Sequence, residues 1–354
     1  MKNVGIITVY HTENCGSVLQ AKCLSDMLSE LNCNVSFIST KNSLSGHSKK
    51  RLFKNCIKKI IKRESFISTI KKYNSYSRFI RNNFNIINYN KIEKLQSVYF
   101  GSDTIWDINS EYFLKSQDIF WGLNINNIDM FSYAASIANS SYSDLDGLEY
   151  PIKQLKKFKK MSARDRYTQN YLSTRTNQKV DIVCDPTLLF DSQYYVKYLK
   201  KTKNSKKYLL LYLFNEPSSA VKKQIMDYAK THEMRIVCLI GIGKLISFAD
   251  EYVESTVENF ISYFYNANCI ITNTFHGTIF SLIFNKNFVT LDYNKIKINE
   301  LLKQFDLTER LTLNNISKKL DEKINYEGVN KKINNLREKS INYLKETINN
   351  EKKC

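Results

Sequence analysis

The residues of this chain best suited to chemistry lie in short turns that follow predicted strands. The turn Thr272–Thr278 separates an apolar run from a predicted helix over 277–285. It places His276 at a helix N-terminus, where main-chain N–H groups attract phosphate or carboxylate and an imidazole can transfer protons near neutral pH. Gly277, which permits close backbone approach, and Thr278 are predicted to bind substrate beside it. The alternative is a histidine that only caps or packs the helix.

A second candidate turn lies near the start of the chain. Asn14, Gly16 and Ser17 follow the first predicted strand, and Gln20 comes one helical turn later. Their amides and side chains are predicted to face a cleft and to bind substrate. Glycine and serine before a helix are also ordinary capping residues, so this turn is weak evidence by itself.

Three further strand ends carry polar side chains. Arg164 suits two-pronged recognition of phosphate or carboxylate, although a surface ion pair is the alternative. Asp103 is a candidate catalytic carboxylate that could orient a hydroxyl or could cap the next helix. Ser136 ends a run of small residues, which leaves room either for a ligand or for close helix packing.

These turns are positioned by an alternation of strands and helices. A strand over 4–10, a helix with an apolar face and a strand over 35–39 form a Rossmann-type start. A second alternating unit begins with a strand over 208–214. The predicted fold class is α/β, with two Rossmann-like domains facing a cleft. Ligands in such folds bind beyond the carboxyl ends of the strands.

The predicted domains follow from this pattern. Residues 1–199 form the first Rossmann-like domain, with a basic helical insertion near 49–90. Residues 200–325 form the second, beginning at a charged connector, and 326–354 form a basic helical tail. Within the insertion, Lys49–Arg63 has apolar residues at i, i+4 and i+8. The preferred interpretation is a cover helix packed on the first domain, and the alternative is a helix lying on an anionic membrane.

Composition limits the classes of function. The net charge of +19 favours a polyanionic partner, but the codon usage of an AT-rich genome would also produce it. The eight cysteines show no metal-ligand spacing, so no metal is predicted and a reducing compartment is favoured. No targeting segment and no run of eighteen apolar residues are evident. The protein is predicted to be cytoplasmic, with peripheral contact to the inner face of the membrane as an option.

Six segments of the chain occur in a fixed order: Asn14–Gln20, Gly101–Trp106, Tyr133–Ser136, Ser162–Asp165, Asp185–Leu189 and Thr272–Ser281. Taken together and in this order, they resemble the polysaccharide pyruvyl transferase family. The similarity spans roughly residues 4–310, and the ordered set is far more specific than any one piece. The chain departs from the family at Asn273, where Asp is usual, and at Thr274, where some members carry Arg.

The resemblance implies a GT-B-like fold with the active site in the cleft. It implies phosphoenolpyruvate as the donor substrate, a surface or capsular glycan or a lipid-linked saccharide as the acceptor, and a pyruvate ketal as product. By motif position, His276 and Arg164 match the residues that hold the donor and assist proton transfer. No cofactor is expected besides the donor substrate.

Two other classes of function remain open on sequence grounds. One is a nucleotide-sugar-dependent glycosyltransferase of similar fold, which would bind a nucleoside diphosphate. The other is a non-enzymatic basic module for RNA or membrane. Nucleic acid is not expected as a partner, because the aromatic residues do not interleave with the basic ones as stacking platforms would.

Overall fold

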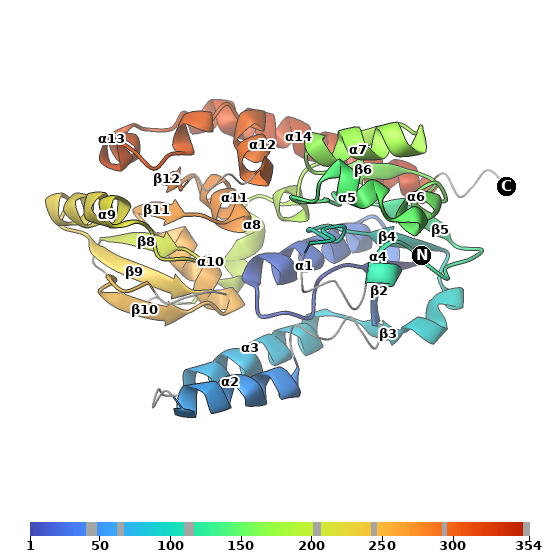
Figure 1. The fold of residues 1–354 in the computed structure, drawn as a ribbon, viewed down its shortest axis with the longest axis horizontal. Helices are drawn as coiled ribbons and strands as arrows, with labels where there is room; N and C mark the ends of the chain where they lie inside the picture. Colours follow the sequence, from blue (N-terminus) through green and yellow to red (C-terminus); the bar gives the residue numbers. More distant parts are fainter. Residues whose placement is uncertain are drawn as a thin grey trace.

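The framework of the protein is a pair of five-stranded parallel sheets (Figure 1). The computed structural model describes residues 1–39, 48–61, 67–109, 117–200, 207–241, 246–291 and 296–349. The strand orders are β3-β2-β1-β4-β5 and β10-β9-β8-β11-β12, so both sheets reverse their order beside the first strand of each unit. The first sheet consists of β1 (Lys2–Ile7), β2 (Cys33–Ser39), β3 (Ile86–Asn88), β4 (Ser97–Phe100) and β5 (Asp129–Ser132). The second consists of β8 (Tyr208–Tyr212), β9 (Arg235–Ile240), β10 (Glu251–Glu254), β11 (Cys269–Thr272) and β12 (Asn287–Thr290).

A short pair of parallel strands extends the first sheet. β6 (Met161–Ala163) pairs with β7 (Val180–Ile182). Isolated bridges join Phe131 to Lys160 and Ala135 to Ala163, which places β6 next to β5. The strand that ends at Ala163 therefore delivers Arg164 to the same edge of the sheet as the earlier turns.

The central strands form because their sequences are apolar on both faces. All five residues of β8 are buried, as are all four of β4 and of β11. Strands covered on both faces by helices have this composition, whereas an amphipathic surface strand would alternate. The edge strand β10 has no fully buried residue.

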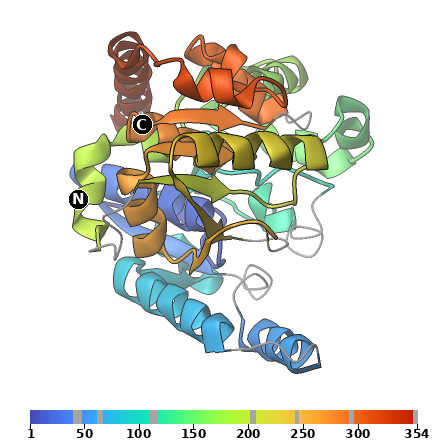
Figure 2. The same cartoon turned by 90° about the vertical axis from the view of Figure 1, so that its left-hand side faces the viewer.

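Helices cover both faces of the sheets (Figures 1 and 2). The longer ones are α1 (Cys15–Glu30), α2 (Lys49–Ile61), α3 (Ile67–Asn83), α7 (Arg166–Thr176), α9 (Ser219–Thr231), α10 (Val257–Asn266), α11 (Phe275–Ile283), α12 (Ile296–Gln304) and α14 (Tyr326–Asn349). Short helices are α4 (Gln117–Phe120), α5 (Tyr142–Asp146), α6 (Glu149–Leu155), α8 (Ser192–Tyr195) and α13 (Ile316–Asp321). Short 3₁₀ helices are η1 (Tyr89–Lys94), η2 (Pro186–Leu189), η3 (Val196–Tyr198) and η4 (Thr308–Arg310). No helix in these ranges is long and apolar enough to cross a membrane.

Helix α14 returns the chain from the second sheet to the first (Figure 1). The Tyr343 hydroxyl donates to the carbonyl of Ser132 at the end of β5, and the Ser340 hydroxyl accepts from the N–H of Cys184. Tyr343 and Leu344 are buried in the core. The predicted tail over 326–354 is thus a packed element over its described part, because its apolar residues meet partners from the first half of the chain.

The basic insertion also crosses between the halves. The Lys72 ammonium in α3 donates to the carbonyls of Ile240 and Gly241 at the end of β9, both at 3.0 Å. The Tyr76 hydroxyl donates to the carbonyl of Ser255. Two buried side chains of α3 therefore fix the second sheet to an insertion of the first, while the predicted domain boundaries themselves remain predictions.

Candidate functional site

The predicted site residues come from the points at which both sheets reverse their strand order. α1 begins after β1, and Asp103 follows the neighbouring strand β4. His276 follows β11, which adjoins β8 at the corresponding point of the second sheet. Such reversal points leave a crevice at the carboxyl edge of a parallel sheet, since the helices on either side diverge there.

The first turns of α1 and α11 contact each other directly. Asn14 caps α1 by accepting the N–H of Gly16, and Thr274 caps α11 by accepting the N–H of Gly277. A Cβ added to Gly16 would lie 2.1 Å from Nδ1 of His276, so only glycine leaves room for this ring. The contact joins the two halves of the chain at the predicted catalytic histidine.

A buried carboxylate lies beside the histidine. Oδ2 of Asp185 is 3.7 Å from Nε2 of His276, which forms an ion pair when the imidazole is protonated. The same oxygen accepts from Nη1 of Arg164 at 3.2 Å and from the hydroxyl of Ser102 at 3.3 Å. The other oxygen, Oδ1, accepts the main-chain N–H and the hydroxyl of Thr187. Asp185 thus joins the histidine to the arginine.

Arg164 is buried and forms ion pairs with two carboxylates, those of Asp185 and Asp103. Its guanidinium lies over the ring of Phe275, with 4.3 Å between the guanidinium carbon and the ring centroid. Its Nη2 is 3.6 Å from Oδ1 of Asp103, beyond hydrogen-bond distance. Nε and Nη2 have no hydrogen-bond acceptor within the described part of the chain. These two donors point from one planar group, as two-pronged recognition of an anion requires.

Asp103 faces the same cluster from the turn after β4. Its Oδ2 accepts from the hydroxyl of Ser17 at 2.6 Å, and its Oδ1 accepts the N–H of Thr104. Its φ of +74° is a left-handed conformation that aspartate tolerates better than most residues. Ser17, Asp103 and Arg164 therefore lie together, as the sequence predicted for the shared edge.

Electrostatics keeps both carboxylates charged. Burial alone would raise the pKa of Asp185, but the contacts with His276 and Arg164 outweigh it and hold the pKa well below its ordinary value. Burial opposes ionisation of Asp103 as well, and the positive charges of Arg164, His276 and Lys297 lower its pKa overall. A lowered pKa makes each carboxylate a hydrogen-bond acceptor rather than a strong base near neutral pH.

Helix α12 approaches the cluster from the second half of the chain. Lys297 in its first turn adds positive charge near Asp103. The Gln304 side chain at its end donates to the carbonyl of Arg164 at 3.2 Å. The site is therefore bordered by α1, α11 and α12, and elements of both halves complete it.

Four predicted binding residues have internal partners. Nε2 of Gln20 donates to Thr8, Val9 and Ser17 and so braces the first turn. Ser136 donates to Asp165, and Thr278 donates to the carbonyl of Thr274 and contacts the hydroxyl of Thr290. The Gly277 N–H is bound by Thr274, and a Cβ there would lie 2.1 Å from the Thr272 hydroxyl oxygen. Gly277 is therefore closely packed within the first turn of α11, and its role in ligand binding stays a prediction.

Sequence reasoning did not select Asp185 as a site residue. The signal was present, because Asp185–Leu189 was one of the segments that carried the family resemblance. At Asn273, where the family usually has Asp, Oδ1 accepts the N–H of Phe214 beside β8. The carboxylate near the histidine therefore comes from another turn of the chain.

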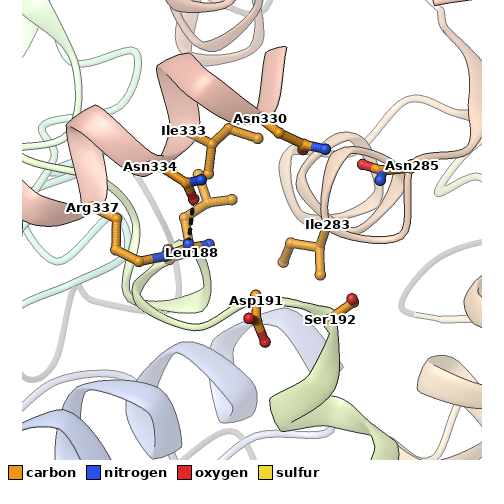
Figure 3. Close-up of a pocket in the computed structure, with 9 residues that line it drawn as sticks. All are labelled: Leu188, Asp191, Ser192, Ile283, Asn285, Asn330, Ile333, Asn334 and Arg337. Atoms are coloured by element: carbon orange, nitrogen blue, oxygen red, sulfur yellow. Dashed lines mark hydrogen bonds between the residues drawn. The ribbon is translucent and has the colours of Figure 1, made fainter. Parts of the chain in front are cut away.

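A polar cavity of about 200 Å³ is lined by Leu188 of η2, Ile283 of α11 and Arg337 of α14 (Figure 3). Arg337 donates to the carbonyls of Leu188 and Phe190, which fixes the turn that follows Asp185. The cavity contains none of the predicted site residues. Within the ranges that the structure describes, no three His, Cys, Asp or Glu side chains are grouped closely enough to hold a metal ion.

Comparisons with known proteins agree with this architecture. A family model described as polysaccharide pyruvyl transferase matches residues 14–295. No curated protein matches the chain at a significant level. The solved UDP complex of MnaA from S. aureus is 13% identical, with a TM-score of 0.57 and coverage of 99% of this chain and 97% of that one. UDP-GlcNAc 2-epimerase from Neisseria meningitidis, bound to UDP-GlcNAc, is 10% identical, with a TM-score of 0.55 and coverage of 98% and 99%. These likenesses confirm the predicted GT-B-like fold.

Gly16→Ala tests the contact between the two helix starts. The added methyl group would overlap the His276 ring, so we expect a loss of about 1–3 kcal/mol in the free energy of unfolding. Urea unfolding measures it. Gly147→Ala is the matched control, because a Cβ there would lie 3.4 Å from the nearest atom. Equal stability of the Gly16 variant and wild type would contradict the close packing.

Asp185→Asn tests the buried ion pairs through their pH dependence. The folded-state pKa of Asp185 lies below the unfolded value of about 3.9, so its stabilisation is complete above that pH and is lost as pH falls. We expect the variant to be about 3–5 kcal/mol less stable at neutral pH, with the difference narrowing in acid. Urea unfolding across this pH range measures both, with Asp227→Asn, an exposed site on α9, as control. A pH-independent difference would contradict the assignment.

Proposed function

Because this chain belongs to the polysaccharide pyruvyl transferase family, and is therefore a transferase, we propose that it transfers pyruvyl from phosphoenolpyruvate to two hydroxyls of a surface or capsular glycan. The observation that carries the proposal is the buried cluster in which Asp185 contacts both His276 and Arg164. It combines a group that can move protons with one that can hold an anion, at the crevice of a GT-B-like fold.

Arg164 is the proposed anchor of the donor. Phosphoenolpyruvate carries a carboxylate and a phosphate, and both are ligands that a planar guanidinium binds through two parallel hydrogen bonds. Nε and Nη2 of Arg164 have no hydrogen-bond acceptor among the described residues, and Lys297 adds positive charge nearby. Asp185 and Phe275 hold the guanidinium in one orientation, so little of its rotational freedom remains to be lost on binding.

His276 is the proposed general acid. Its protonated ring donates a proton to the methylene carbon of the donor, which creates positive character at the adjacent carbon. The buried Asp185 carboxylate lies 3.7 Å from Nε2 and orients the ring. This arrangement supplies the orienting carboxylate that Asn273 cannot.

The acceptor completes the reaction in two additions. One sugar hydroxyl attacks the activated carbon, phosphate leaves, and the proton of that hydroxyl departs with it as hydrogen phosphate. The second hydroxyl closes the ketal and returns a proton to His276. Asp103 is proposed to orient the acceptor, because its lowered pKa suits hydrogen-bond acceptance. Ser17 holds it in place.

His276→Asn should lower kcat by about 100- to 10,000-fold, because it removes the general acid. Donor affinity should change little, because the arginine remains. Single-turnover assays with phosphoenolpyruvate and a glycan acceptor measure the rate of transfer, and thermal shift measures donor binding. His232→Asn, on a half-exposed histidine at the end of α9, is the control. A folded variant of His276 with most of its activity would refute the role.

Arg164→Lys should weaken phosphoenolpyruvate binding by roughly tenfold or more, although the charge is kept, since an ammonium lacks the planar pair of donors. Titration of the thermal shift measures it. The same experiment on wild type separates the two proposed activities, because a nucleotide-sugar-dependent glycosyltransferase would be stabilised by a UDP-sugar instead. Stabilisation by the UDP-sugar alone would refute the pyruvyl donor.

A further inference from the structure

Helix α2 carries large apolar side chains that are partly or mostly exposed. Phe53 is 68% exposed and Ile57 is 39% exposed, and Ile67 at the start of α3 is 57% exposed. A cover helix would have buried the first two against the first domain, so that interpretation is wrong for Phe53, while Ile57 is partly covered. Figures 1 and 2 show α2 at the margin of the molecule, beside α3 and away from both sheets.

The same helix is strongly basic. Residues 49–61 contain no Asp or Glu, and their basic residues are Lys49, Lys50, Arg51, Lys54, Lys58 and Lys59. Lys49 and Lys50 precede Phe53 by four and three positions, and Lys54 precedes Ile57 by three, so these lysines border the apolar pair. All three are exposed. Exposed apolar residues bordered by cations are the pattern of a helix that lies in the surface of an anionic bilayer.

A cavity connects this helix with the carboxyl edge of the first sheet. It has a volume of about 550 Å³ and is lined by Lys49 of α2, by Tyr73 and Arg81 of α3 and by His11. His11 belongs to the connection between β1 and α1, three residues before Asn14. The space beside α2 thus reaches the loop that leads into the candidate site.

We propose that α2 docks on an anionic lipid bilayer, with Phe53 and Ile57 among the headgroups and the bordering lysines against acidic lipid. A second copy of this chain is a poor occupant, because two such basic helices would repel each other. Nucleic acid would match the positive charge of α2 but offers no apolar environment for Phe53 and Ile57. Docking of α2 on a bilayer does not depend on the proposed pyruvyl transfer. Only the suggestion that docking brings the enzyme to a lipid-linked glycan rests on the proposed function.

Sedimentation of the full chain with vesicles tests the docking. Vesicles of phosphatidylglycerol and phosphatidylcholine are compared with phosphatidylcholine alone, at low and moderate salt. The variant Lys50→Gln/Lys54→Gln should weaken binding by about 25-fold, since each cation near an acidic surface contributes about fivefold. Phe53→Ser/Ile57→Ser should weaken it by at least about tenfold. The matched control is Met226→Ser/Lys223→Gln/Lys230→Gln, which changes exposed residues of α9.

A fluorescence measurement separates insertion from simple charge attraction. The native tryptophans, Trp106 and Trp121, are both fully buried, so Phe53→Trp adds an exposed reporter. Its emission should shift to the blue on anionic vesicles. Wild type that fails to bind at low salt, equal loss of binding in the α9 control, or an unshifted reporter on bound protein would each overturn the proposal. Phosphoenolpyruvate-induced thermal shift should be unchanged in the α2 variants, so failure of docking and failure of the proposed function are told apart.

Discussion

The structure of the site depends on the groups that offset the buried negative charge of Asp185. Asp185 accepts hydrogen bonds from Arg164, Ser102 and Thr187 and lies 3.7 Å from Nε2 of His276. An isolated charge in this position would be strongly unfavourable, and the partners of Asp185 offset the cost of burying it. Because Arg164 belongs to the first half of the chain and His276 to the second, the contacts of Asp185 also link the two halves.

Other contacts between the two halves of the chain support the same cluster of charged residues. Gly16 has no Cβ, which leaves room for the His276 ring, and the Gln304 side chain donates to the carbonyl of Arg164. Lys72 reaches from the insertion to the end of β9, and Arg337 fixes the turn that follows Asp185. The contacts of Gly16, Gln304 and Arg337 restrain segments that carry members of the cluster, and the Lys72 contact ties the insertion to the second sheet. A site with this support keeps its charged groups oriented before any ligand arrives, which lowers the cost of reorganisation during a reaction.

Much of the fold could be predicted from the sequence because local signals were strong. The strands over 35–39 and 208–214 were predicted to within two residues of their observed bounds, Cys33–Ser39 and Tyr208–Tyr212, since each is an apolar run between polar segments. β3 and β10 were missed because they are short edge strands with few buried residues. The packing of α14 could not be predicted, because the partners of Tyr343 and Ser340 lie in the first half of the chain.

The site shows where sequence reasoning reaches its limit. Strand ends indicated that Ser17, Asp103, Arg164 and His276 share an edge, because parallel strands deliver their turns to one side. Whether a polar side chain faces a ligand or bonds to a neighbouring residue depends on distances in the folded structure. Spacing along the sequence does not give these distances. Asn273 illustrates this point: its amide binds the backbone beside β8, while the carboxylate near the histidine is supplied by Asp185, 91 positions earlier in the sequence. His276 therefore has an acidic neighbour even though residue 273, which adjoins β11, is Asn. A carboxylate acts on the imidazole through its distance in space, so it need not come from the same sequence motif.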